Sequence, residues 1–429
     1  MTDSRASRPR FSGLSARTRP LPADPRAAAS VASGIGPQDA QGPAPEEGCP
    51  GVLSVIVDRS PGSAALRSWD EFVRSCPQSD VAQLSGWARV RALVGYEPLY
   101  VFVRNGARLV AGAQVLVRQI PLLGRFGYVP YGPLVAPAAL RSTAVQETLA
   151  TALAEVARQH RGLFVQPPEQ GEQLSAALIR RGFRPSDAKV TPSTSLRVDL
   201  SLDEAQLRHN LSRRLRGWTH QWAARGVTVR RGRPEDLPLA ARLHALTAVH
   251  QGFTPLSLDY LAAMDRELSP SGHFFVLIGE VDGQPGAMGA YTGNGAVLKA
   301  RLVGLDRTAR AARLDVVAAV DWHALTWAKR NGYRWFDFSG LGAQSLAALE
   351  SPGRADLGRL PGPDRYKLRF GGEPFRYPQP VERVSPPAFQ ITIDLLRRSD
   401  GGQRVMEFAR GWARTGSWRR GTSSPGRGW

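Results

Sequence analysis

The feature of this sequence that most constrains its fold is an order of elements that occurs twice along the chain. Residues 99–117 read as two strands around Asn105-Gly106, a dipeptide that suits the left-handed angles of a type I′ turn. Residues 274–291 repeat this pattern around Asp282-Gly283. The two hairpins are offset by roughly 170 residues, so element order predicts an internal structural duplication, although sequence identity between the halves is negligible.

A helix and a further strand follow each hairpin. In the first half, a loop rich in glycine and proline is expected over residues 119–137, followed by a helix over 138–160 and a strand over 162–166. In the second half, the long helix is expected over 309–330 and the last strand over 333–338.

The length of 429 residues suits two domains with tails. Residues 1–50 contain few large apolar side chains and are predicted to be disordered, because they bury too little surface to offset their conformational entropy. We expect an α/β protein with a first mixed-sheet domain over 51–200, which residues 373–395 complete, and a second over 201–372. A basic tail rich in arginine and tryptophan is expected over 396–429.

Several classes of protein are disfavoured. No apolar run reaches the ~18–20 residues that a helix needs to cross a bilayer. Residues 1–10 contain arginines but no following hydrophobic region, as a secretory signal would require. Two cysteines and seven scattered histidines predict neither a disulfide framework nor a zinc site. We therefore expect a cytoplasmic protein without a metal.

The net charge of +19 is typical of a protein that binds polyanions such as nucleic acid, anionic lipid headgroups or nucleotide-linked substrates. An alternative also stays open, that GC-rich coding simply favours arginine.

One helix is expected over residues 203–225, with Ser201 and Glu204 forming a capping box before it. An apolar stripe runs along it through Leu207, Leu211, Leu215, Trp218 and Trp222. The other faces include Arg213, Arg214 and Arg216. Two interpretations of these arginines stay open, a solvated basic surface and a site that binds a polyanion.

The tail, residues 397–429, interleaves eight arginines with Trp412, Trp418 and Trp429. Such a segment can stack on nucleic-acid bases or bind at a membrane surface. A merely disordered basic tail is an equally open alternative.

The order of elements resembles that of the GNAT (acyl-CoA N-acyltransferase) fold, but the usual cofactor motif of that fold is missing. GNAT enzymes hold the pyrophosphate of acyl-CoA on the amides of a glycine-rich turn that opens a helix. Residues 307–313 stand at the matching place and contain no glycine. This disfavours ordinary acyl-CoA chemistry.

Four segments resemble the Fem aminoacyltransferase family, FemX-like enzymes that attach amino acids from aminoacyl-tRNA to peptidoglycan precursors. They are Gln83-Leu84-Ser85-Gly86-Trp87 and the residues to Arg91, the Gly-Pro loop at 127–134, the helix, strand and Asp-Phe-Ser-Gly turn at 322–340, and Tyr366-Lys367 with the Phe-Gly-Gly that ends at 372. The resemblance implies two GNAT-like domains with the active site between them. It also implies no cofactor beyond the tRNA donor.

The resemblance assigns roles to two residues of the second domain. Lys367 matches the lysine thought to stabilise the tetrahedral intermediate, and a fixed cation beside an oxyanion suits that role. Tyr366 stands at the place of the neighbouring aromatic residue and is a candidate for substrate binding, with packing as the alternative. Asp337, at the end of a strand, is a candidate for positioning the amine, or alternatively a structural turn former.

Other matches concern the binding of the precursor. Arg91 stands where the family has a phosphate-binding lysine, and an arginine fork also suits phosphate. Tyr131 matches a substrate-binding tyrosine, with core packing as the alternative. There are two departures: His250 stands at the place of a phosphate-binding arginine, and Ala136 at that of a carboxylate.

The function expected from these features is transfer of an amino acid from aminoacyl-tRNA to an amine of a UDP-linked or lipid-linked peptidoglycan precursor, with peripheral contact to the inner membrane surface. One alternative is a tRNA- or acyl-CoA-dependent N-acyltransferase for another amine, such as a natural-product intermediate. A second is a GNAT-like module without activity that binds RNA or a membrane.

Overall fold

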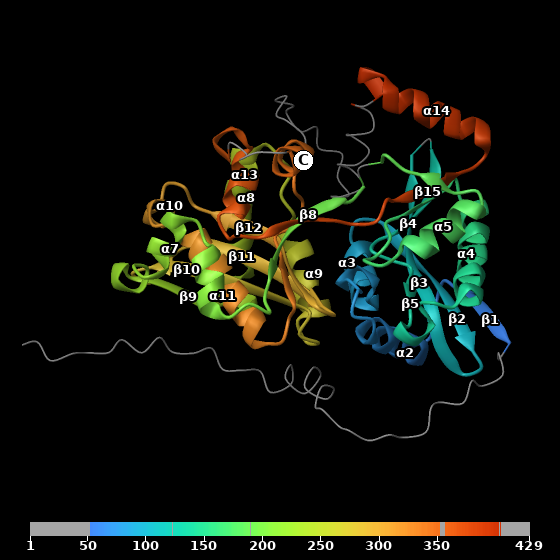
Figure 1. Ribbon diagram of the computed structural model, residues 1–429, viewed down its shortest axis with the longest axis horizontal. Helices are drawn as coiled ribbons and strands as arrows, with labels where there is room; N and C mark the ends of the chain where they lie inside the picture. Colours follow the sequence, from blue (N-terminus) through green and yellow to red (C-terminus); the bar gives the residue numbers. More distant parts are fainter. Residues whose placement is uncertain (1–51, 122, 189, 352–356, 403, 405–429) are drawn as a thin grey trace, which may run out of the picture. The chain divides into compact units, whose positions relative to one another are not determined.

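The computed structural model describes residues 52–121, 123–188, 190–351, 357–402 and 404. The segment expected to be disordered, 1–50, and most of the basic tail lie outside these residues. The described chain forms two mixed β-sheets with helices against them, as predicted (Figure 1). None of its helices has the length and apolar character needed to cross a membrane.

The first sheet contains β1 (Leu53–Asp58), β2 (Tyr96–Asn105), β3 (Arg108–Ile120), β4 (Gly124–Val129), β5 (Leu134–Val135), β6 (Gly162–Val165), β7 (Arg184–Pro185) and β15 (Val381–Val384). Their order is β1-β2-β3-β4-β6-β15-β7, and β5 pairs with β3. The pair β4 and β6 is parallel, whereas the other pairs are antiparallel.

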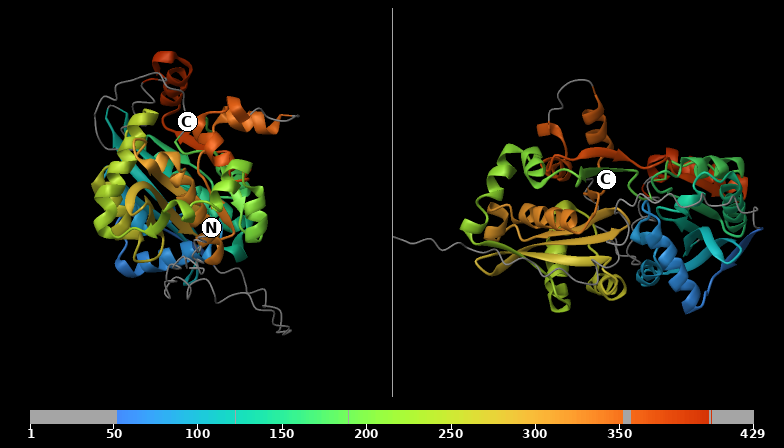
Figure 2. Two further views of the ribbon diagram at one scale, coloured as in Figure 1. Left: turned by 90° about the vertical axis from the view of Figure 1, so that its left-hand side faces the viewer. Right: turned by 60° about the horizontal axis from the view of Figure 1, so that its bottom comes forward.

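The second sheet contains β8 (Thr194–Asp199), β9 (Val227–Arg231), β10 (Phe274–Val281), β11 (Gln284–Asn294), β12 (Val297–Leu305), β13 (Trp335–Asp337) and β14 (Glu373–Arg376). The order is β14-β8-β13-β12-β11-β10-β9, with β12 and β13 as its parallel pair. Figure 2 shows its long central strands side by side in yellow. Both sheets thus contain a hairpin, a strand, a helix and a strand parallel to the previous one, which confirms the duplicated order.

The α-helices of the described chain are α2 (Ser63–Ser75), α3 (Ser85–Ala92), α4 (Thr143–Arg158), α5 (Glu172–Arg180), α6 (Glu204–Asn210), α7 (Arg213–Thr219), α8 (Leu237–Gln251), α9 (Leu258–Leu268), α10 (Arg310–Arg313), α11 (Val316–Arg330), α12 (Ala343–Glu350), α13 (Gly362–Leu368) and α14 (Pro387–Arg398). Single 3₁₀ turns are η1 (Val81–Gln83), η2 (Pro137–Ala139), η3 (Ala223–Arg225), η4 (Pro234–Asp236) and η5 (Leu357–Arg359).

The loop expected over 119–137 is wrong, because β4 and β5 lie within it. Its glycines suggested a loop, but Gly127 serves packing in β4. A Cβ at Gly127 would lie 2.7 Å from Cδ1 of Leu163 on the neighbouring strand β6. Glycine here allows close packing inside the sheet rather than ending a strand.

The single helix expected over 203–225 is also wrong. Leu211 is extended with ψ 148°, so the segment divides into α6, α7 and η3. The backbone N–H of Ser212 donates to the carbonyl of Arg369 at 2.8 Å, and its hydroxyl caps α7. The apolar stripe still packs in the core, because most of its residues are buried on both sides of the break: Leu207, Leu211, Leu215 and Trp222.

The capping box of this segment is shifted by two residues from the predicted one. The Asp203 carboxylate accepts from the backbone N–H of Gln206, and the Gln206 side chain accepts from that of Asp203. The predicted long helix 309–330 is likewise interrupted, because Asp315 has a φ of 56° between α10 and α11. Local sequence signals located the helical segments of both regions but missed the interruptions at Leu211 and Asp315.

We call the first sheet with its helices the first lobe and the second sheet with its helices the second lobe. Figure 1 shows α4 and α5 beside the strands of the first lobe, and α11 packs on β10 and β11 in the second. One hydrophobic cluster joins the lobes, since Val90 of α3 packs with Leu261 and Met264 of α9. A Cβ at Gly86 would lie 2.8 Å from the Glu267 carbonyl, so α3 and α9 approach closely.

The predicted domain boundaries, 51–200 for the first domain and 201–372 for the second, stay a proposal. β8, which precedes residue 200, pairs with β13 and β14 of the second sheet. β15 pairs with β6 and β7 of the first sheet. The chain therefore passes between the sheets on both sides of the second domain.

Candidate active site

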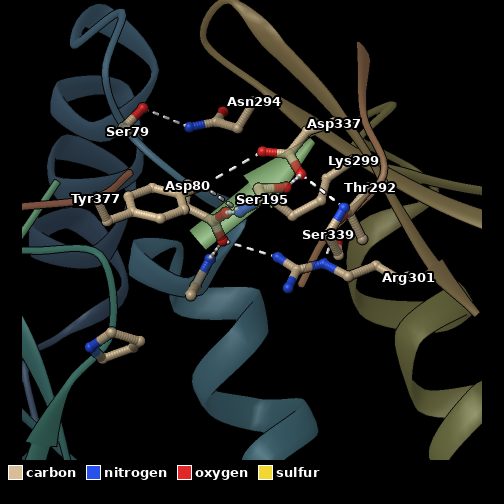
Figure 3. Close-up of polar contacts among 12 residues, drawn as sticks. Ser79, Asp80, Ser195, Thr292, Asn294, Lys299, Arg301, Asp337, Ser339 and Tyr377 are labelled. Carbon is tan, nitrogen blue, oxygen red and sulfur yellow. Dashed lines mark hydrogen bonds and ion pairs between the residues drawn. The ribbon is translucent and has the colours of Figure 1, made fainter. Parts of the chain in front are cut away.

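A polar pocket lies where residues of the two lobes meet. Its lining includes Ser79, Asp80 and Tyr131 from the first lobe, Asn294 and Lys299 from the second, and Tyr377 from the segment between β14 and β15. Figure 3 shows Ser79, Asp80, Asn294, Lys299 and Tyr377 turned toward one another from separate elements. Because hydroxyl, amide, carboxylate and ammonium groups converge here, the pocket is the leading candidate for the active site.

Lys299 is the central cation of this pocket. Its side chain on β12 is only 7% exposed. The ammonium donates to Oδ2 of Asp80 at 2.7 Å and to the Tyr377 hydroxyl at 3.0 Å. It also lies 4.2 Å from the ring centroid of Tyr131, within the range of a cation–π contact. All of these partners favour the charged form.

Arg301, two residues further along β12, binds the same carboxylate. Its Nη2 donates to Oδ1 of Asp80 at 2.8 Å, and its Nε donates to the Thr292 hydroxyl at 2.7 Å. Residues two apart in a strand lie on one face, so β12 presents both cations to Asp80. The Asp80 carboxylate is therefore bound by two cations at once.

The pKa values show that this ion-pair group stays ionised. Burial acts to raise the pKa of Asp80, but the charges of Lys299 and Arg301 outweigh it and hold that pKa well below its usual range. Burial acts to lower the pKa of Lys299, and the Asp80 charge overcomes it, so that pKa is raised. Lys299 is therefore a permanent cation at physiological pH.

Asp80 is placed by the turn that follows it. Its carboxylate caps η1 by accepting from the backbone N–H of Ala82 at 2.9 Å. Gln83, at the end of η1, donates to the Pro130 carbonyl at 2.8 Å and accepts from the Gln114 backbone at 2.8 Å. The segment around Gln83 and the Gly-Pro loop, both named in the sequence resemblance, thus lie together.

Tyr131 lines the pocket, which agrees with its expected place near a substrate. Its φ of 48° is unusual for a residue with a side chain and turns the chain sharply before Gly132. A Cβ at Gly132 would lie 2.7 Å from the Gln83 side chain, so a larger residue there would displace the Gln83 amide. Burial raises the pKa of the Tyr131 phenol.

Asp337 is a fully buried junction of hydrogen bonds at the end of β13. It accepts from the Ser195 hydroxyl, from Nε of Arg197 at 3.1 Å and from the Ser339 backbone at 2.7 Å. The Tyr377 hydroxyl, 3.4 Å away, links it to Lys299. With its lone pairs occupied, Asp337 positions other groups of the site.

Lys367 lies on α13 and is turned toward the backbone after β13. Its ammonium donates to the carbonyl of Ser339 at 2.9 Å and to that of Gly340, and Asp364 lies 3.8 Å away. Burial lowers its pKa, which Asp364 and Asp337 oppose. Lys367 does not line the pocket, and its catalytic role stays a prediction.

Tyr366 points into the second lobe. Its hydroxyl donates to Asp321 of α11, which also accepts from the Tyr291 hydroxyl at 2.7 Å. Burial raises the pKa of Asp321 to about 6, and the two hydroxyls oppose the rise. In this conformation the polar atom of Tyr366 serves the core, and its substrate role stays a prediction.

The expected phosphate-binding residues lie outside the pocket. Arg91 of α3 donates to the Tyr260 hydroxyl at 3.1 Å and lies 4.5 Å above the Tyr96 ring. His250 is exposed at the end of α8. Arg213 and Arg214 are exposed on α7, whereas Arg216 is half-buried near His209. None of these five residues lines the pocket, and their binding roles stay predictions.

The residues that sequence reasoning missed are Asp80, Lys299, Arg301 and Tyr377. One signal was available, because Lys299 and Arg301 stand two apart within residues 296–303, an otherwise apolar run of the length of a strand. Two cations on one face of such a strand indicate a buried partner or a ligand. The partner itself could not be found, since Asp80 is 219 positions away. Within the described ranges, no three His, Cys, Asp or Glu side chains are placed to hold a metal ion.

Two family models match this chain, one in each lobe. The FemAB family model matches residues 66–177, and a model described as an acetyltransferase (GNAT) domain matches residues 205–368. A solved structure, FemX, superposes with a TM-score of 0.66 at 15% identity, covering 76% of this chain and 98% of FemX.

Two curated relatives are named Lipid II:glycine glycyltransferase. The protein from Staphylococcus saprophyticus is 24% identical over 229 residues, or 50% of this chain and 54% of the relative. The protein from Staphylococcus aureus strain MRSA252 is 23% identical over 226 residues, or 50% and 53%. The chain spans about half the length of the curated relatives it matches.

These findings define a protein with two GNAT-like α/β domains, as the sequence predicted. Within that class the chain is similar to Fem proteins in sequence and in fold, which confirms the resemblance found in its motifs.

The pocket makes a prediction about stability. Asp80→Ala leaves Lys299 and Arg301 buried without their carboxylate, so the free energy of unfolding should fall by about 3–5 kcal/mol. Lys299→Met leaves Asp80 paired with Arg301 and should cost clearly less. Urea denaturation of both variants and of the double variant measures this. Equal losses in the two single variants would contradict the charge argument.

Asp321 predicts a pH dependence of stability. Its pKa rises from 3.8 to about 6 on folding, so its stabilising contribution is full below pH 3.8 and is lost as pH rises through about 6. Between pH 4 and 7 the free energy of unfolding should fall by up to about 3 kcal/mol from this group. Asp321→Asn should remove that fall. Denaturation across this range gives the difference between wild type and variant, and parallel curves would refute the assignment.

Proposed function

We propose that this protein is an aminoacyltransferase that moves an amino acid from aminoacyl-tRNA to an amine of a peptidoglycan precursor. The observation that carries the proposal is the pocket with its buried cation, Lys299, between lobes that match the FemAB and GNAT models. The names of the relatives support a lipid-linked precursor as acceptor. A cytoplasmic location and independence from a cofactor are part of the same proposal.

The reaction is attack of a neutral amine on the carbonyl carbon of the aminoacyl ester. The new C–N bond makes a tetrahedral intermediate with negative charge on oxygen. The C–O ester bond then breaks, the tRNA hydroxyl leaves with a proton, and the nitrogen loses one. No covalent intermediate with the protein is needed. Orientation of the two substrates and a fixed cation beside the oxyanion are sufficient contributions.

The turn before α10 argues against acyl-CoA as donor. In GNAT enzymes the amides of such a turn bind pyrophosphate. Here the Asp306 carboxylate accepts from the backbone N–H groups of Thr308 at 3.0 Å and Ala309 at 3.3 Å. A carboxylate already occupies these donors and would repel a pyrophosphate. A donor bound elsewhere, through a basic surface, fits the charge of +19.

Two lysines compete for the cation beside the oxyanion. Lys299 lines the pocket, whereas Lys367 is held by backbone carbonyls. We expect Lys299→Met to lower kcat by about 10²–10³-fold with little change in KM, the scale of losing one oxyanion donor. Lys299→Arg should keep part of the wild-type kcat, because it retains a cation at this position. Lys367→Met should chiefly lower Tm. Steady-state kinetics and thermal melting decide, and a large kcat loss confined to Lys367→Met would return the role to Lys367.

The donor is tested by incubating the pure protein with labelled aminoacyl-tRNAs or acyl-CoA and with lipid-linked, UDP-linked and small amine acceptors. Transfer should require aminoacyl-tRNA, be abolished by prior ribonuclease treatment and weaken as salt rises. Replacing Arg213, Arg214 and Arg216 by Ala should flatten that salt dependence, because Leu215 still anchors α7. Turnover with acyl-CoA that ribonuclease does not affect would overturn the proposal.

A further inference from the structure

We propose that the outer face of α14 is a docking surface for an anionic lipid membrane. The inference does not depend on the reaction proposed above. It rests on the way α14 is held against the first lobe and on the side chains that it leaves facing outward.

A partly buried network of charges around Glu382 fixes which side of α14 faces the protein. Arg397 donates to both oxygens of Glu382, a β15 residue that is almost fully buried and also accepts from the Ser186 hydroxyl at 2.6 Å. Asp394 accepts from Arg184 at 2.7 Å. Ile393 packs inward at 4% exposed. With these inner contacts made, the helix cannot rotate to hide its other face.

That other face presents aliphatic side chains to solvent. Ile391 and Leu395 are each 62% exposed and stand four positions apart, one turn along the same face. Ala388 is exposed on the same side, and exposed Arg398 follows at its end. Figure 1 shows α14 at the edge of the described chain, next to β15. An aliphatic stripe ending in a cation is typical of a helix that lies in a membrane interface.

The sequence beyond α14 supplies matching charge. Residues 405–429, which lie outside the described part, contain five arginines against one acidic residue, Glu407, and three tryptophans. Cations near a surface are attracted to anionic lipid headgroups, and tryptophan prefers the membrane interface. The partner surface is therefore expected to carry negative charge.

Other partners fit this face less well. Aliphatic side chains such as Ile391 and Leu395 offer RNA neither a stacking ring nor a hydrogen bond. Two exposed aliphatic residues on one short helix also bury far less than the ~1,000 Å² expected of a stable interface between copies. A fluid lipid surface needs only a narrow apolar stripe with adjacent cations.

The test is co-sedimentation of the full chain with vesicles of phosphatidylglycerol and phosphatidylcholine in equal parts, at about 0.1 M salt. Wild type should bind them and not bind pure phosphatidylcholine. Ile391→Asp with Leu395→Asp should weaken binding at least about tenfold, because two carboxylates replace apolar contacts. The matched control is Leu246→Asp with Val249→Asp, an exposed apolar pair on α8 at 42% and 81%, which should leave binding unchanged.

Hydrogen exchange should show protection of residues 387–398 on adding vesicles, and thermal melting should confirm that both double variants fold. No vesicle binding by wild type, or equal losses in the two double variants, overturns the proposal. The proposal is also overturned if the Ile391/Leu395 variant binds vesicles as wild type does but has lost tRNA binding or self-association. Turnover with a UDP-linked acceptor should be unaffected in that variant, which separates this result from a failure of the proposed reaction.

Discussion

The burial of a positive charge at Lys299 is the constraint on which the arrangement of the two lobes depends. An ammonium in the interior costs several kcal/mol unless an opposite charge and hydrogen bonds compensate it. The compensating carboxylate, Asp80, belongs to the other lobe. The two lobes must therefore be in contact for the Lys299 ammonium of β12 to be stable in its buried position. Nearby contacts also join the two lobes, such as the 2.6 Å hydrogen bond from the Asn294 amide to the Ser79 hydroxyl.

Features set by neighbouring residues could be predicted from the sequence. Asn105-Gly106 and Asp282-Gly283 located both hairpins. Asp282 and Gly283 both have positive φ, as a type I′ turn requires. The type I′ turn expected at Asn105-Gly106 is wrong, because Asn105 pairs with Arg108 and only Gly106 has positive φ there. The order of elements gave the fold class. The interruptions at Leu211 and Asp315 were missed, since each depends on contacts made after folding. Ser212 bonds to Arg369, and Asp315 pairs with the same arginine.

The candidate site was less predictable for a related reason. Motif resemblance identified Tyr131, which lines the pocket, but periodicity within a segment reports only which face a residue occupies. It does not report which distant residue comes to that face, so the pairing of Asp80 with Lys299 was out of reach. Lys367 illustrates the converse. Its motif was recognised, yet its contacts to the Ser339 and Gly340 carbonyls appear only once the turn after β13 is formed.

The position of β15 has a consequence for how the chain is made. β15 pairs with both β6 and β7, which do not pair with each other. The first sheet is therefore incomplete until the ribosome has passed the entire second sheet, about 200 residues later, on the order of 10–40 s at typical translation rates. During that time the edges of β6 and β7 are open to incorrect pairing. The lobe that is synthesised first is thus the last to be finished, and slow or chaperone-assisted synthesis would favour its correct assembly.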